Sequence, residues 1–297
     1  MLDFNQMLES SVHFGHMRRK WNPKMAPYIF MEKNGIHIID LHKTAEKAEE
    51  AAAAIKQIAK SGKKILFVAT KKQAKEVVSE LVTKVNMPFV TERWPGGMLT
   101  NFVTIRKAVK KMSVLDKLIS DKDTTKINKR ERLQISREKA KLEKNLGSIA
   151  DLTRLPAAIF VIDINKEHIA VAEARRLNIP TFALVDTNTN PDLIDFPIPA
   201  NDDASKSIEL IVKYMCDAIN EGLNERRMDK DARDAEEAEE IKEKALATEL
   251  LDEEEEDAIE KDGAKIKKVK AIAEEEETEK KPRPRKAVAP KKPAPKK

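Results

Sequence analysis

Several side chains suited to nucleic-acid contact lie close together near the start of the chain. The run RRKWNPK places its polar and aromatic groups at Arg18, Arg19, Lys20, Trp21, Asn22 and Lys24. Guanidinium and ammonium groups contact phosphates, and an amide can hydrogen-bond a sugar or a base edge. This composition predicts a contact with an RNA backbone. The alternative is a basic surface loop whose aromatic side chains simply belong to the core. For Trp21, stacking on a base is one role, and a half-buried anchor against the sheet is the one we predict.

A second polar segment, RWPGGMLTN, follows a short predicted strand. The residues predicted to contact RNA here are Arg93, Gly96, Gly97, Thr100 and Asn101. Arg93 would contact a phosphate, and Thr100 and Asn101 would hydrogen-bond sugar or base edges. The glycine pair predicts a tight turn that lets the backbone approach a partner closely, although a turn without a ligand fits the spacing equally well.

The sequence contains no recognisable constellation for catalysis or for a cofactor. The strand predicted over 64–69 is followed by Thr-Lys-Lys-Gln, where a dinucleotide site needs closely spaced glycines. His13 and His16 could share one face of a helix, but no third ligand lies at a recognisable spacing. We therefore predict no enzyme, no cofactor, no metal site and no small-molecule substrate.

Two other classes of protein stay open. An α/β enzyme acting on a phosphorylated ligand would use Asp186, Asp192 and either Lys71 or Lys72 near a strand end, although turn formation explains the acidic group of Asp186, Asp192 and Asp195 better. A protein-interaction scaffold would use a helical hairpin and an acidic tail without touching RNA.

Short apolar runs that alternate with helical periods define the elements that must position these residues. Strands are predicted over 36–41, 64–69, 87–91, 157–163 and 181–186, and helices over 44–60, 71–85, 166–177 and 204–226. Asn165 and Asp203 lie where helix N-caps belong, and Gly62 follows the first helix as a C-terminal stop. This alternation predicts an α/β domain made of residues 1–105 and 150–227. Its sheet is doubly wound, mostly parallel and flanked by helices.

Residues 106–149 interrupt that alternation. Ile135, Leu142 and Ile149 repeat every seven residues, and a polar stretch over 121–125 separates two apolar stripes. We predict a protruding antiparallel coiled-coil hairpin. Residues 106–146 hold 14 basic and 6 acidic side chains, which favours a polyanion as its partner over a merely solvated surface.

The last segment, 228–297, differs in composition from everything before it. Residues 229–262 carry 17 acids against 5 bases, whereas residues 280–297 carry nine bases, five prolines and no acid. Such a segment cannot bury enough apolar surface to order itself, so we predict a disordered tail that acts as an arm or aids solubility. The single cysteine, Cys216, excludes an intramolecular disulfide. No apolar run approaches a membrane span, so the chain is predicted to be cytoplasmic.

Several runs together resemble one family across roughly residues 1–225. They are VHFGHMRRKWNPKMAPYIF from Val12, RWPGGMLTNFVTI from Arg93, LPAAIFVID from Leu155 and IPTFALVDTNTNPDLIDFPIPANDDA from Ile179. The family is that of the bacterial small-subunit ribosomal protein of the S-two type. This chain departs from many members at Pro95, where they carry leucine.

The resemblance implies a structural protein of the ribosome in the cytoplasm. Its expected fold is a doubly wound α/β domain with a protruding coiled-coil hairpin. Its expected partners are the small-subunit (16S) rRNA and neighbouring small-subunit proteins, including the S-one protein, which it would help hold near the mRNA path. No membrane partner is expected.

Overall fold

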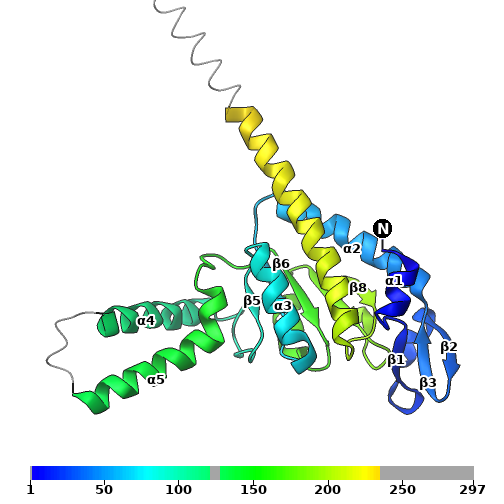
Figure 1. Cartoon of the computed structure of the whole chain (residues 1–297), viewed down its shortest axis with the longest axis horizontal. Coiled ribbons are helices and arrows are strands. Elements are labelled where there is room, and N and C mark those ends of the chain that lie inside the picture. Colours follow the sequence, from blue (N-terminus) through cyan, green and yellow to red (C-terminus); the bar gives the residue numbers. More distant parts are fainter. Residues whose placement is uncertain (1, 121–127, 235–297) are drawn as a thin grey trace, which may run out of the picture. The chain divides into compact units, whose positions relative to one another are not determined.

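The computed structural model describes residues 2–120 and 128–234 (Figure 1). The chain divides into two units, Met1–Lys230 and Asp231–Lys297. The polar stretch predicted over 121–125 and most of the predicted disordered tail lie outside the described residues.

A five-stranded parallel sheet forms the centre of this unit. Its spatial order is β5 (Phe89–Val90), β4 (Ile65–Val68), β6 (Ala158–Ile162), β7 (Thr181–Val185) and β8 (Phe196–Pro199). Every residue of β4, β6 and β7 is buried. Their uninterrupted apolar composition follows from this position, because both faces of a parallel sheet are covered. The predicted parallel α/β sheet is confirmed.

Helices cover both faces of the sheet. On one face, α2 (Leu41–Lys60), α3 (Lys72–Lys84) and the helix that begins at residue 205 pack with the inward side chains of β4, β6 and β7. On the other face lie α6 (His168–Arg176) and the sheet-proximal parts of α4 and α5. Alternate residues of β4 contribute to the two cores, with Phe67 in the first and Val68 in the second. No helix of the described residues is long and apolar enough to span a membrane.

The N-terminal segment forms a second, antiparallel sheet, which the sequence analysis missed. Its order is β1 (Phe14–Met17), β3 (Ile36–Ile39) and β2 (Ile29–Lys33), preceded by α1 (Phe4–Glu9). The strand predicted over 36–41 therefore lies outside the parallel sheet. Asn34 and Gly35 have φ angles of 54° and 75°, so they make the tight two-residue turn that pairs β2 with β3.

Of the three predicted helix caps, two are wrong. The stop at Gly62 is confirmed by its φ of 76° after the last turn of α2. Asn165 does not cap α6, whose N-cap is Glu167. Asp203 does not cap the helix that begins at residue 205, because its carboxylate contacts Lys71 and His16 instead.

Residues 102–120 and 128–149 form two packed helices, α4 (Phe102–Ser120) and α5 (Lys129–Leu146), followed by the short η4 (Gly147–Ile149). Figure 1 shows α4 running away from the sheet and α5 returning. Ion pairs between Lys111 and Glu138 and between Asp116 and Lys139 join the two helices. A helical pair is therefore present, and the coiled-coil seam between its helices stays a prediction.

Candidate nucleic-acid interface

The first predicted RNA-contact segment is docked onto the loop that follows β7. The backbone N–H groups of His16 and Asn22 donate to the side-chain and main-chain oxygens of Thr187, each at 2.8 Å. A Cβ atom on Gly15 would lie 2.6 Å from the Thr187 side chain, so only glycine permits this approach. The segment is thus held at the carboxyl end of the parallel sheet.

The cations of this segment differ in how far they are neutralised. Arg18, Arg19 and Lys20 form the exposed turn η1 (Arg18–Lys20). Arg18 lies 3.4 Å from Glu32, whereas Arg19 and Lys20 make no ion pair with the described residues. Lys24 pairs directly with Asp192 in η5 (Pro191–Leu193). Arg19 and Lys20 therefore carry the positive charge most available to a phosphate.

Trp21 is half-buried, as predicted for this residue. Its ring packs against that of His37 in β3, with the ring centroids 5.0 Å apart. The indole also lines an open hollow of about 600 Å³, whose rim includes Arg18 and Arg19. The ring is anchored from within and still presents part of its surface beside two cations, where a base could stack.

Asn22 has a structural task at the next turn. Its side-chain oxygen accepts the backbone N–H of Lys24 at 3.0 Å and so begins η2 (Pro23–Tyr28). It also lines a pocket of about 230 Å³ that includes His168 and Arg175 of α6. Its predicted contact with RNA is untested by this geometry and stays a prediction.

The second predicted segment wraps around a buried carboxylate that the sequence analysis missed. Glu173 of α6 accepts the backbone N–H groups of Gly97, Leu99 and Thr100 at 2.7, 2.9 and 3.1 Å. It also accepts the indole N–H of Trp94 at 3.2 Å. Burial alone would raise the pKa of Glu173, but these donors hold it below its ordinary value.

This arrangement gives the glycine-containing turn an internal role. Gly97 has a φ of 85°, the left-handed conformation that the predicted tight turn requires. The Thr100 hydroxyl also contacts Glu173, and Asn101 accepts the Thr104 hydroxyl at the start of α4. Arg93 is exposed and makes no ion pair with the described residues. The only sequence signal for Glu173 is a glutamate on the apolar face of α6, between Val171 and Ala174.

A polar cluster lies behind the first segment. His16 Nδ1 is 2.9 Å from Asp186 Oδ2, and its Nε2 is 3.4 Å from Asp203. Lys71 Nζ lies 2.9 Å from Asp202, 2.7 Å from Asp203 and 3.7 Å from Asp163. The bond to Asp186 raises the pKa of His16. Burial, together with the charge of Asp186, raises the pKa of Asp202 to about 7.

Three members of this cluster could hold a divalent cation. His16, Asp186 and Asp202 each offer a ligand atom, and these atoms lie within 4.8 Å of one another. Asp202 Oδ2 is buried and has no hydrogen-bond donor among the described residues. A nitrogen and two carboxylate oxygens suit an ion such as Zn²⁺. The sequence analysis considered a metal site only for His13 and His16 on one face of a helix. That placement is wrong, because His16 lies in the strand β1, and the two carboxylates beside it come from distant loops.

We expect Asp202 to make the protein less stable as the pH rises. Between about pH 4 and pH 7 the unfolded chain releases this proton while the folded chain keeps it, so the free energy of unfolding falls across that window. The raised pKa of His16 acts in the same direction. Asp202→Asn should flatten this pH dependence by about 4 kcal/mol in urea unfolding. The exposed control Glu209→Gln should keep the wild-type slope, and equal slopes for the two variants would refute the expectation.

Most of the residues that a phosphate-using enzyme would need are engaged in other contacts, whereas Lys72 is exposed and forms no ion pair with the described residues. Lys71 is neutralised by the three carboxylates described above, and Asp192 pairs with Lys24. Between the carboxyl ends of β4 and β6, where α/β enzymes bind ligands, Glu167 accepts the hydroxyl and backbone N–H of Thr70. Asp186, Asp192 and Asp195 do not form one site either. The carboxylate of Asp195 accepts hydrogen bonds from the backbone N–H and the hydroxyl of Thr181.

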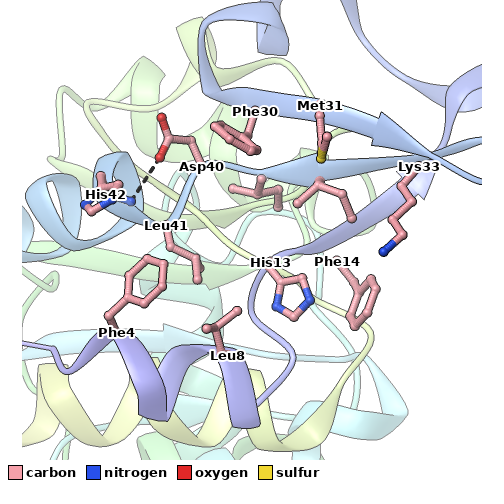
Figure 2. Close-up of a pocket in the computed structure, with 12 residues that line it drawn as sticks. Phe4, Leu8, His13, Phe14, Phe30, Met31, Lys33, Asp40, Leu41 and His42 are labelled. Carbon is pink, nitrogen blue, oxygen red and sulfur yellow. Dashed lines mark hydrogen bonds between the residues drawn. The ribbon is translucent and has the colours of Figure 1, made fainter.

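An apolar groove of about 360 Å³ lies between α1 and the antiparallel sheet (Figure 2). Figure 2 shows Phe4 and Leu8 of α1 facing Phe14 of β1 and the pair Phe30 and Met31 of β2. Phe30 is 69% exposed and the other four are between 41% and 49% exposed. Exposed apolar side chains gathered in one hollow mark an interaction surface.

Comparison with known proteins identifies the family. Residues 7–222 match the family model described as Ribosomal protein S2. The chain belongs to this ribosomal protein family. The resemblance noted in the sequence is therefore confirmed.

Relatives in the family are similar over most of their length. The chain is 69% identical to the small ribosomal subunit protein uS2 of Phocaeicola vulgatus over 228 residues, which cover 77% of this chain and 82% of the relative. It is 63% identical to uS2 of Parabacteroides distasonis over 247 residues, covering 83% and 89%. For uS2 of Bacteroides fragilis the identity is 68% over 228 residues, covering 77% and 82%.

Membership of the family brings the described surfaces under one interpretation. The basic turn η1 and the apolar groove lie on the same small N-terminal sheet, which is docked on the parallel sheet by Gly15 and Asn22. One surface suits a polyanion and the other suits a protein. A structural component of a ribonucleoprotein particle needs both kinds of contact.

Proposed function

We propose that this protein is a structural constituent of the small ribosomal subunit and binds small-subunit rRNA. The observation that carries the proposal is the family match, joined to the exposed and largely unneutralised cations of η1. Exposed arginine and lysine on a docked turn contact phosphates with little reorganisation. The protein would then act on the ribosome in the cytoplasm, with no reaction to catalyse.

Within this proposal, the contacts to rRNA come from two segments. They comprise Arg18, Arg19, Lys20, Trp21, Asn22 and Lys24 in the first, and Arg93, Gly96, Gly97, Thr100 and Asn101 in the second. Lys24 and Thr100 would contribute least, because Asp192 and Glu173 already bind them. The lysines and arginines of α4 and α5 would extend the footprint.

The test is sedimentation of tagged protein from cell lysate through sucrose gradients at rising salt. The proposal expects co-migration with the small subunit at moderate salt and release as salt increases, because phosphate contacts depend steeply on ionic strength. Protein that stays at the top of the gradient at every salt concentration would overturn the proposal.

We further propose that the apolar groove helps anchor the neighbouring S-one protein. The groove combines exposed aromatic side chains with few charges, and its charged lining is limited to Lys33 and Asp40 apart from two histidines. Apolar pockets of this kind carry most of the binding energy at protein interfaces. A folded RNA offers little to such a surface.

Removing the groove's aromatic side chains should release the S-one protein without releasing this one. In subunits purified from cells that carry Phe14→Ser/Phe30→Ser, S-one occupancy should fall roughly tenfold, as quantified by mass spectrometry. The matched control Val103→Ser/Val114→Ser removes exposed apolar groups from α4 and should keep full occupancy. Unchanged occupancy in the groove variant would show that S-one docks elsewhere.

A further inference from the structure

A basic groove lies at the edge of the parallel sheet opposite the N-terminal segment. It has a volume of about 370 Å³ and opens where the chain enters β4 and β5. Its cations come from three elements and are Lys63, Lys64, Lys84, Arg226, Arg227 and Lys230. No aspartate or glutamate is among the described residues that line it. Such a surface attracts a polyanion.

The helix that begins at residue 205 separates its charges between two sides. Its acids Glu221, Glu225 and Asp229 face α2, where Lys56 lies 3.1 Å from Glu221 and 2.8 Å from Glu225. Lys60 of α2 lies 3.4 Å from Glu225 and 3.2 Å from Asp229. The acids of this stretch are thus used against α2.

The groove side keeps its positive charge. Lys63, Arg226 and Arg227 make no ion pair with the described residues, and Lys64 donates to the main-chain oxygen of Asn86 at 2.5 Å, which leaves its charge intact. Lys84, in contrast, has a carboxylate partner, Glu80, at 2.9 Å.

Two glycines hold the groove walls at fixed separation. A Cβ on Gly222 would lie 2.5 Å from the main-chain oxygen of Lys56, so the helix crosses α2 at backbone contact. A Cβ on Gly62 would lie 1.8 Å from the Arg226 guanidinium, which therefore rests on the turn between α2 and β4. Cations held in place before binding lose little conformational freedom when an anion arrives.

We propose that this groove binds the phosphodiester backbone of a second RNA segment. Guanidinium groups of Arg226 and Arg227 suit the forked geometry of phosphate, and lysines from the opposite wall add charge. The N-terminal segment lies at the carboxyl ends of the strands and the groove at their amino ends, so the domain bridges two stretches of rRNA. The inference rests on the proposed rRNA-binding function and extends it to a second, separate site.

The first test measures affinity for small-subunit rRNA at several salt concentrations, using the full chain. Arg226→Gln/Arg227→Gln should weaken binding roughly tenfold and lower the salt slope by about 1 to 2. The matched control Lys206→Gln/Lys213→Gln removes the same charge from exposed positions of the same helix and should bind as the wild type does. Lys63→Gln/Lys64→Gln tests the opposite wall independently of that helix.

The outcomes separate this inference from the proposed function. If rRNA binding is lost when η1 is neutralised but both groove variants bind like the control, the groove inference fails and the proposed function stands. If the wild-type chain does not bind rRNA at all, both fail. If the groove variants bind rRNA normally but lose affinity for polyglutamate, the groove takes an acidic protein segment and the RNA assignment is overturned.

The second test maps the two contacts directly. Because the one cysteine, Cys216, is buried and burial raises its thiol pKa to about 12, new cysteines can be labelled selectively. Iron chelates tethered through Asn34→Cys, beside η1, and Asn224→Cys, beside the groove, should cleave different segments of rRNA in reconstituted subunits. If the chelate at Asn34→Cys cleaves rRNA and the chelate at Asn224→Cys does not, the inference that the groove binds a second stretch of rRNA is overturned.

Discussion

Replacing Arg18, Arg19 and Lys20 together by glutamine should weaken binding to small-subunit rRNA roughly 100-fold at moderate salt and lower the salt slope by about 2 to 3. The reason is that all three side chains are exposed on η1, and two of them have no carboxylate within ion-pair distance among the described residues. Affinity measured by filter binding across a salt series would give both quantities.

The fold should survive these substitutions, because none of the three side chains is buried. A matched control, Arg176→Gln/Lys206→Gln/Lys213→Gln, removes equal charge from exposed helical positions and should leave affinity and slope nearly unchanged. A variant of η1 that unfolds, or that binds with the wild-type slope, would show that these residues are not phosphate contacts.

Truncating Glu173 should have the largest effect on stability of any substitution considered. Glu173→Ala leaves three backbone N–H groups and the indole N–H of Trp94 without their acceptor, in a site that is mostly closed to water. Unsatisfied buried donors are costly, so we expect a loss of about 3 to 5 kcal/mol in the free energy of unfolding. Urea unfolding would measure it, with the exposed Glu209→Gln as the control.

The pH dependence of stability and the rate of amide exchange distinguish the hydrogen-bonding role of Glu173 from a general packing defect. Its lowered pKa means that it stabilises the fold above its ordinary pKa, and this contribution is lost as the pH falls through the folded-state value. The amides of Gly97, Leu99 and Thr100 should exchange faster with solvent in Glu173→Ala. Unchanged amide exchange, or an unfolding free energy within 1 kcal/mol of wild type, would contradict the assignment.

If the loop held by Glu173 also carries rRNA contacts, its rigidity matters for binding. Arg93 is exposed at the start of this loop, and its neighbour Trp94 is buried. The carboxylate of Glu173 thus connects the fold of α6 to the placement of a candidate contact. A buried glutamate is costly unless it is hydrogen-bonded, and here five groups donate to it.

The sequence by itself determined the parallel sheet and most of its helices. Strands such as 64–69 and 181–186 are apolar at consecutive positions, which happens when both faces of a strand are covered, and that information is local. Gly62 as a helix stop is local for the same reason, since only its own φ angle is involved. The family motifs were equally local, because each is a contiguous run of residues.

Pairings between distant segments were decided only by the tertiary structure. The antiparallel sheet depends on β3 pairing both with β2, through the Asn34-Gly35 turn, and with the more distant β1. His16 meets Asp186 and Asp202 only because β1 docks on the loop after β7. Glu173 and the basic groove arise in the same way, from elements far apart in the chain. Spacing in a sequence reports which face of an element a side chain occupies, but the partner on that face is set by how the elements pack.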